Sequence, residues 1–108
     1  MNGRESKEAI VLQVNVQRKG VAMDVMWKTV QEEGVNVLVV SEPNKKRVKG
    51  VEWITDVKED VAVRVFGRHE RGERFGKGEG FVWIKFNEWV LYGCYISPNT
   101  GIERYRKF

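Results

Sequence analysis

The stretch Val35-Asn-Val-Leu-Val-Val-Ser-Glu-Pro43 decides the fold, because it is almost wholly apolar and stops at a carboxylate. A short, valine-rich run between Gly34 and Pro43 is typical of a strand that is buried on both faces, with helices covering the sheet. Ligands of open α/β sheets bind at the carboxyl ends of such strands. Glu42 stands at that end. It is either a solvated acid that opens a polar loop or a ligand for a hard cation such as Mg²⁺.

Length and composition limit the class of protein. The 108 residues are enough for one domain with a modest core, and 31% charged with 42% hydrophobic residues excludes a disordered chain. No apolar run could span a membrane, and residues 1–8 form a polar tail without the features of a secretory signal. We therefore expect an intracellular protein with no membrane partner and one domain over residues 9–108. Its net charge of +4 permits anionic partners, and a single cysteine excludes an internal disulfide and a cysteine-based zinc site.

A βαβ unit is predicted around the opening stretch. Residues 9–16 alternate in polarity like a strand, and residues 21–33 form an amphipathic helix that ends at Gly34. Its inward positions at three- and four-residue spacing are Ala22, Val25, Met26, Thr29 and Val30, with Trp27 on the flank. Parallel strands end at the same edge of a sheet, so Asn15, otherwise a common turn-former, is expected beside Glu42.

A basic loop follows at residues 44–50. It contains Lys45, Lys46, Arg47 and Lys49 and leaves the sheet at the edge where Glu42 stands. The loop is either a solvated connection or a contact for a phosphate backbone.

The second half of the chain predicts more strands. Residues 53–56 and 61–66 are two short strands around a polar turn, and residues 67–80 are a glycine-rich surface loop. His69 in this loop has no visible base or metal partner and is not predicted to be catalytic. Residues 81–86 and 89–96 form a hairpin, expected in the middle of a covered sheet with Cys94 as a small core residue. Tyr95 ends that hairpin, and its hydroxyl either caps the core or faces a pocket.

The last segment predicts a helix that is cut short. Thr100 and Glu103 have the spacing of a capping box, and Ile102, Tyr105 and Phe108 follow at three-residue intervals. The helix stops after about two turns, below a useful length. One helix and an unfinished second helix cannot cover both faces of so apolar a sheet, so we expect the front half of a larger domain.

Four blocks of sequence carry a family resemblance. They are Gln13-Val14-Asn15, Ser41-Glu42-Pro43, Gly80-Phe81-Val82-Trp83-Ile84 and Cys94-Tyr95-Ile96-Ser97-Pro98-Asn99. In this order they resemble the amino-terminal half of the endonuclease/exonuclease/phosphatase family, and most closely its apurinic-endonuclease-like branch in non-LTR retrotransposons. The similarity runs from about Ile10 to the last residue. Gln17 stands where the repair-enzyme branch commonly has an acid, which favours the retrotransposon branch.

The resemblance implies the amino-terminal half of a four-layer α/β sandwich, acting as a Mg²⁺-dependent DNA endonuclease that nicks target DNA. Glu42 matches the metal-ligand glutamate, and Asn15 matches the strand-one asparagine beside the metal. Tyr95 matches the tyrosine that contacts the scissile phosphate, and Asn99 more loosely matches an asparagine that contacts phosphate. No family motif covers Lys45, Lys46 and Arg47, so their contact with DNA is a separate hypothesis.

The family also supplies a downstream Asp-x-Asn pair and a terminal Asp-His pair, which this sequence lacks. Its last aspartate is Asp60 and its sole histidine is His69. Because catalytic residues act as a unit, the chain is expected to be inactive alone. Its expected partners are DNA and the missing carboxy-terminal half or the reverse transcriptase domain of the same element, and its expected location is the nucleus. The alternatives are a non-catalytic basic nucleic-acid-binding module and a degenerate retroelement fragment.

Overall fold

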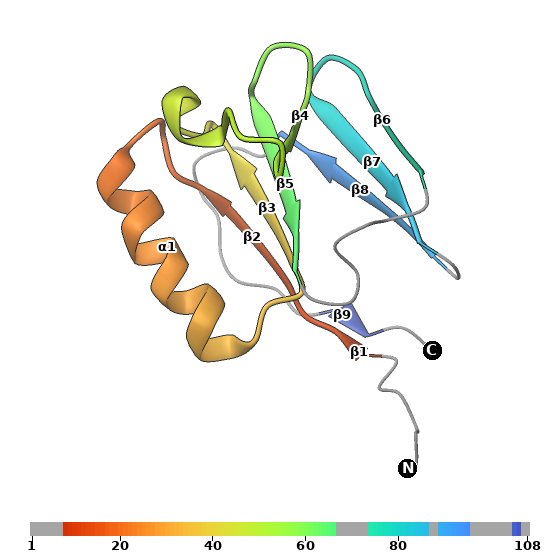
Figure 1. The fold of residues 1–108 in the computed structure, drawn as a ribbon, viewed down its shortest axis with the longest axis horizontal. Coiled ribbons are helices and arrows are strands. Elements are labelled where there is room, and N and C mark those ends of the chain that lie inside the picture. The colour runs from red at the N-terminus through yellow and green to blue at the C-terminus, as the bar shows by residue number, and fades with distance from the viewer. Residues whose placement is uncertain (1–7, 67–73, 87–88, 96–104, 107–108) are drawn as a thin grey trace.

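The computed structural model describes residues 8–66, 74–86, 89–95 and 105–106. One helix and two sheets form three layers in this part of the chain (Figure 1). The α-helix lies on one face of a four-stranded mixed sheet, and a three-stranded antiparallel sheet packs on the other face. No helix in the described ranges is long and apolar enough to cross a membrane. The predicted α/β class is confirmed.

The four-stranded sheet has the strand order β2-β3-β5-β4. Its strands are β2 (Val11–Asn15), β3 (Val37–Ser41), β4 (Ile54–Thr55) and β5 (Val61–Val65). β2 and β3 are parallel, because α1 (Gly20–Glu33) returns the chain to the end where β2 began. The other two pairs are antiparallel, and the short 3₁₀ helix η1 (Lys45–Val48) lies between β3 and β4.

β3 is the centre of the fold. All of its positions are buried, as the apolar stretch predicts. Leu38 and Val40 belong to the core under α1, whereas Val37 and Val39 belong to the core between the sheets. The prediction that helices cover the sheet holds for one face only, since the second sheet covers the other.

α1 confirms the predicted helix, with a different inward face. It ends at Gly34 in the left-handed conformation (φ 64°), where glycine carries no Cβ penalty. Its buried residues are Met23, Met26 and Val30, whereas Val25 is 62% exposed. Val25 was therefore placed wrongly, because at 100° per residue it points away from the stripe that Met23 and Val30 define.

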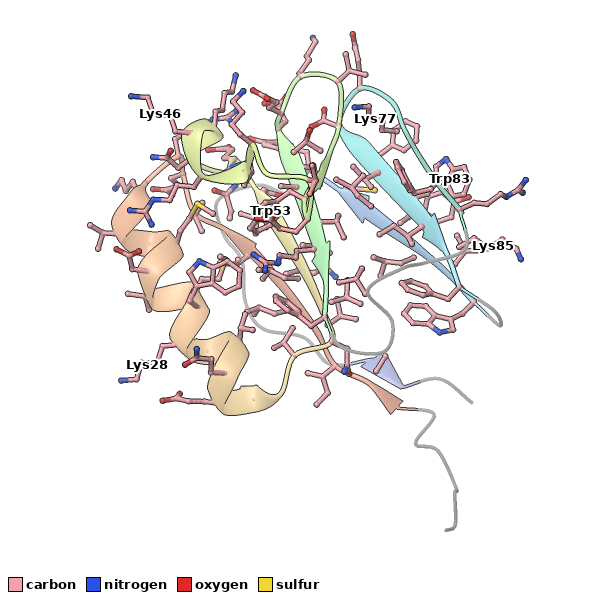
Figure 2. All side chains as sticks on the ribbon, in the orientation of Figure 1. Lys28, Lys46, Trp53, Lys77, Trp83 and Lys85 are labelled. Atoms are coloured by element: carbon pink, nitrogen blue, oxygen red, sulfur yellow. The ribbon has the colours of Figure 1, made fainter. Side chains whose placement is uncertain are left out.

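The second sheet consists of β6 (Arg74–Lys77), β7 (Phe81–Lys85) and β8 (Val90–Cys94), in that order. The β7–β8 hairpin is confirmed, with Lys85 opposite Val90. β6 lies inside the predicted surface loop, and that prediction is wrong for residues 74–77. Gly76 does not break this strand, because its missing side chain leaves space for Trp83 on β7 (Figure 2); a Cβ there would lie 2.5 Å from the indole Nε1. His69 lies outside the described residues.

The outer face of this sheet is not covered by any described element. Val82, Ile84 and Gly93 face the inner core, so the alternate positions point outward, and Tyr92 is 66% exposed. Cys94 is also exposed, so the prediction of a covered sheet with a core cysteine is wrong.

The predicted terminal helix is contradicted where it can be seen. β9 (Tyr105–Arg106) is a strand, and it pairs antiparallel with β1 (Glu8–Ala9). Pairing with β1 supplies backbone hydrogen bonds between segments, whereas a two-turn helix gains little in water. The predicted capping residues Thr100 and Glu103 lie outside the described residues.

Candidate functional site

Four segments meet at the edge where β2 and β3 end. Asn15 pairs with Ser41 in the register of the parallel strands, so Asn15 is next to the residue that precedes Glu42. The N–H of Glu42 donates to the carbonyl of Asp60 (2.8 Å), which brings in the β4–β5 turn. The hydroxyl of Ser41 donates to the carbonyl of Cys94 (3.4 Å) at the end of β8. The predicted proximity of Asn15 and Glu42 is therefore confirmed.

Glu42 has a strained backbone at this edge. Its φ is 51°, a conformation that non-glycine residues rarely adopt. Its N–H is bonded to Asp60, and its carbonyl accepts from the N–H of Arg18 (2.6 Å). Such strain persists only where surrounding contacts hold the backbone in place, and it is common at functional sites. The side chain is half-buried, so its carboxylate remains within reach of a ligand.

Tyr95 contacts Glu42 directly. Its hydroxyl donates a hydrogen bond to Oε2 of Glu42, across the two sheets. This bond, helped by partial loss of hydration and by the negative charge of Glu42, raises the pKa of Tyr95. The hydroxyl is therefore protonated at neutral pH and acts as a donor. The main-chain N–H of Tyr95 is also fixed, through a bond to the carbonyl of Gly80 (2.9 Å).

Asn15 supports the turn after β2. Its side chain is buried, and its Oδ1 accepts from the N–H of Gln17 (2.9 Å). Gln17 and Arg18 both have positive φ, 53° and 62°, which is unusual for two successive non-glycine residues. An asparagine that hydrogen-bonds two residues ahead is a common way to hold such a turn. Asn15 thereby positions Arg18, which follows Gln17 in this turn.

Arg18 was missed in the sequence, although it joins three loops. Its guanidinium donates to the carbonyls of Pro43 (3.2 Å) and Glu59 (2.8 Å) and to the carboxylate of Asp60 (2.5 Å). Its partners lie 25 to 42 residues away in sequence, so no local pattern indicates them. The guanidinium of Arg18 therefore stabilises the backbone around Glu42.

Asp56 is the second residue that sequence reasoning missed. Its side chain is 1% exposed, and its carboxylate accepts from the N–H groups of Asp60, Val61, Lys58 and Gly80. Burial acts to raise the pKa of Asp56, but these N–H groups favour the charged form more strongly, so its pKa lies below the usual value. The only signal in the sequence is an acid at the end of a predicted strand, followed by a polar turn.

The basic side chains of residues 44–50 differ in their contacts. Lys45 and Lys46 are exposed on η1, and Figure 2 shows Lys46 projecting from the end of the molecule where β3 ends. Arg47 instead turns to α1, where it donates to Asp24 (2.6 Å) and to the carbonyl of Gly20 (3.3 Å). The contact of all three with DNA stays a prediction, and Asn99 lies outside the described residues.

A metal ion at this edge would be held by one carboxylate of the protein together with groups of a bound substrate. Within the described ranges, no group of three or more histidine, cysteine, aspartate and glutamate side chains could hold a metal ion. Mg²⁺ is usually bound through one or two carboxylates together with waters and substrate phosphates. Glu42 can supply that carboxylate, with a phosphate completing the shell.

Comparison with known proteins identifies the fold. No family model matches the sequence, and neither does any curated protein. Among solved structures, the chain is similar to the endonuclease domain of TRAS1, a telomere-specific non-LTR retrotransposon, with 20% identity and a TM-score of 0.59. The match covers 87% of this chain and 48% of that domain, so the chain spans about half the domain's length. The suspected resemblance is thus confirmed, and the chain has the fold of a non-LTR retrotransposon endonuclease domain over about half of that domain.

Proposed function

We propose that this chain is part of a DNA endonuclease domain of a non-LTR retrotransposon, and that Glu42 and Tyr95 act on a phosphodiester with Mg²⁺. The observation that carries the proposal is the hydrogen bond between the Tyr95 hydroxyl and the Glu42 carboxylate, at the edge where β2 and β3 end. The fold that the chain shares with the endonuclease domain of a non-LTR retrotransposon supports it.

The two side chains suit complementary tasks. Glu42 would hold the cation, and bound Mg²⁺ would polarise a phosphoryl oxygen and stabilise the leaving oxyanion. Tyr95 has one hydroxyl group that can donate a hydrogen bond, and in this structure the acceptor is the Glu42 carboxylate. With the carboxylate engaged by a cation, the hydroxyl would be free to donate to a phosphate oxygen, where a preorganised donor would favour the transition state.

The surrounding residues orient this pair. Asn15 holds the turn that carries Arg18. Arg18 donates to the carbonyl of Pro43, which follows Glu42, and to the carbonyl of Glu59, which precedes the residue bonded to the Glu42 N–H. The exposed ammonium groups of Lys45 and Lys46 would attract the phosphate backbone of DNA to this edge.

Activity requires more residues than this chain offers. A hydrolytic water must lose a proton to a general base. Asp60, the last aspartate of the sequence, is paired with Arg18, and the sole histidine, His69, is not matched to a catalytic position. We propose that the base comes from the remaining half of the domain, and that this chain binds DNA and metal but does not cut alone. DNA, that remaining half and a reverse transcriptase domain are the proposed partners, in the nucleus.

A binding and nicking assay tests the proposal. The chain is titrated with a fluorescent DNA duplex with and without Mg²⁺, and is incubated with supercoiled plasmid under the same conditions. We expect Mg²⁺ to tighten DNA binding, Glu42→Gln to remove that gain, and no nicking. Glu59→Gln, which removes an acid paired with Lys49 on the surface, is the matched control and is expected to keep the gain.

Two outcomes would contradict the proposal. Metal-dependent nicking by the chain alone would refute its inactivity. DNA binding that is sensitive to salt but indifferent to Mg²⁺ and to Glu42 would replace the nuclease assignment with a non-catalytic binding module, the second candidate, which the net charge of +4 and the exposed Lys45 and Lys46 favour.

A further inference from the structure

A closed ring of hydrogen bonds runs through Asp56, Asp60, Glu42, Tyr95 and Gly80. Asp56 Oδ1 accepts from the Asp60 N–H (2.6 Å), and the Asp60 carbonyl accepts from the Glu42 N–H (2.8 Å). The Glu42 carboxylate accepts from the Tyr95 hydroxyl, and the Tyr95 N–H donates to the Gly80 carbonyl (2.9 Å). The Gly80 N–H closes the ring at Oδ2 of Asp56 (2.8 Å). We call these five residues the Asp56 ring.

The carboxylate of Asp56 bridges the two sheets. Oδ1 is bonded to Asp60 and Val61, at the start of β5 in the four-stranded sheet. Oδ2 is bonded to Lys58 in the β4–β5 turn (3.3 Å) and to Gly80, which precedes β7 in the other sheet. A second link runs beside it, from the Val57 N–H to the Gly78 carbonyl (3.1 Å). The buried carboxylate therefore sets the spacing between the turns that carry Glu42 and Tyr95.

That spacing matters because the pair itself is poorly held by other means. Tyr95 is 47% exposed, so packing does little to fix its ring. Glu42 depends on main-chain bonds to hold its positive φ. A charged acceptor that receives several N–H bonds in a buried position is a strong and rigid anchor.

We propose that Asp56 is a positioning residue of the endonuclease site: its carboxylate holds the Gly80 turn against the β4–β5 turn, and so sets the Tyr95 hydroxyl on the Glu42 carboxylate. Asp56 itself touches neither metal nor phosphate. The inference rests on the proposed function, because only there does the placement of Tyr95 beside Glu42 serve catalysis.

The direct test is the variant Asp56→Asn in the whole chain, followed by amide hydrogen exchange measured by NMR. An asparagine keeps one acceptor oxygen but faces the remaining N–H groups with its amide, so it breaks one of the two links. We expect exchange at the Tyr95 N–H, which donates to the Gly80 carbonyl, to rise about threefold or more while the fold remains intact by circular dichroism. Glu59→Gln removes an acid from the same turn without touching the Asp56 ring and is expected to leave that exchange unchanged. Unchanged exchange at the Tyr95 N–H in a folded Asp56→Asn protein would overturn the proposal.

The reciprocal test needs no change at the buried site. Coupling between two sites is mutual, so removing the hydroxyl of Tyr95 must weaken the bond of Gly80 to Asp56. In Tyr95→Phe, we expect amide hydrogen exchange at the Gly80 N–H to rise about threefold or more, as for residues of one network. The matched control is Tyr92→Phe, which changes an exposed tyrosine on β8, the strand that precedes Tyr95. Exchange at Gly80 that is equal in both variants would contradict the proposal, even if Asp56→Asn does not fold.

These readouts separate the two ideas. Neither measurement uses DNA, metal or cleavage, so the Asp56 ring can fail while Mg²⁺-dependent DNA binding through Glu42 stands. If DNA binding is indifferent to Glu42 but both NMR tests succeed, the proposed function fails and the Asp56 ring is a structural link only.

Discussion

Glu42 illustrates how a single residue comes to depend on others far along the chain. A carboxylate at the end of a buried strand is ordinary, but a strained φ of 51° at that position is not. Arg18, Asp60 and Tyr95 each contribute one contact that keeps it there. These contacts offset the cost of the strained backbone and so fix the position of the Glu42 side chain.

We expect Asp56 to contribute to the stability of the protein in acid. Because its pKa is lowered in the folded state, its contribution to the free energy of unfolding is present above the unfolded value of 3.8 and is lost as pH falls through the lower folded value. We expect Asp56→Asn to reduce the free energy of unfolding at pH 7 by about 2 kcal/mol. The variant should also lose the part of the decline below pH 3.8 that Asp56 causes.

Urea unfolding at a series of pH values measures both effects. Glu32→Gln is the control, because it removes the same charge from an exposed position on α1. An Asp56→Asn protein as stable as Glu32→Gln at pH 7 would show that the buried hydrogen bonds contribute little.

At the scale of elements, local patterns predicted most of the architecture. Alternation of period 2 predicted β2, two apolar runs around a two-residue turn predicted the β7–β8 hairpin, and a valine-rich run predicted β3. Each signal lies within one segment, so the sequence is sufficient to find it. The failures were β6 and β9, where partners decide the structure: β6 pairs with β7, and β9 pairs with β1. Glycines at 76 and 78 indicate a loop only until Trp83 and Phe81 are known to occupy the space beside them.

The residues of the candidate site also differ in whether local sequence indicates them. Asn15, Glu42 and Tyr95 stand at strand ends, and an order of short motifs was enough to single them out. Arg18 acts through hydrogen bonds to residues 25 to 42 positions away, and Asp56 joins its local turn to Gly80, 24 positions away. No local spacing encodes these distant contacts.

The inward face of α1 gives the prediction at this scale. Met23 is fully buried and Val25 is 62% exposed, although the spacing of apolar residues had placed Val25 inward. Met23→Ala should lower the free energy of unfolding by about 2–5 kcal/mol, through lost burial and the cavity left behind. Val25→Ala should change it by less than about 0.5 kcal/mol. Denaturant unfolding of both variants measures the difference, and equal losses would show that the helix is rotated from the orientation described.

In the whole molecule, the three-stranded sheet is buried on its inner side and exposed on its outer side. The inner side packs against the four-stranded sheet, and none of the described elements lies over the outer side. Phe81, Val90 and Tyr92 project there and are 37%, 45% and 66% exposed. Exposed apolar side chains that lie together on a surface are typical of an interaction site.

Exposed apolar side chains on a sheet promote association between copies of a protein. We expect the isolated chain to self-associate with rising concentration, and the double variant Val90→Lys/Tyr92→Lys to weaken association at least about tenfold, because two apolar contacts are lost and like charges are introduced. Sedimentation velocity over a concentration series measures this. The matched control is Val21→Lys/Val51→Lys, which adds the same charge at positions 75% and 100% exposed away from that sheet. If both double variants weaken association equally, net charge explains the effect and the outer face does not; if the wild-type chain is a monomer throughout, the face is stable in water as it stands.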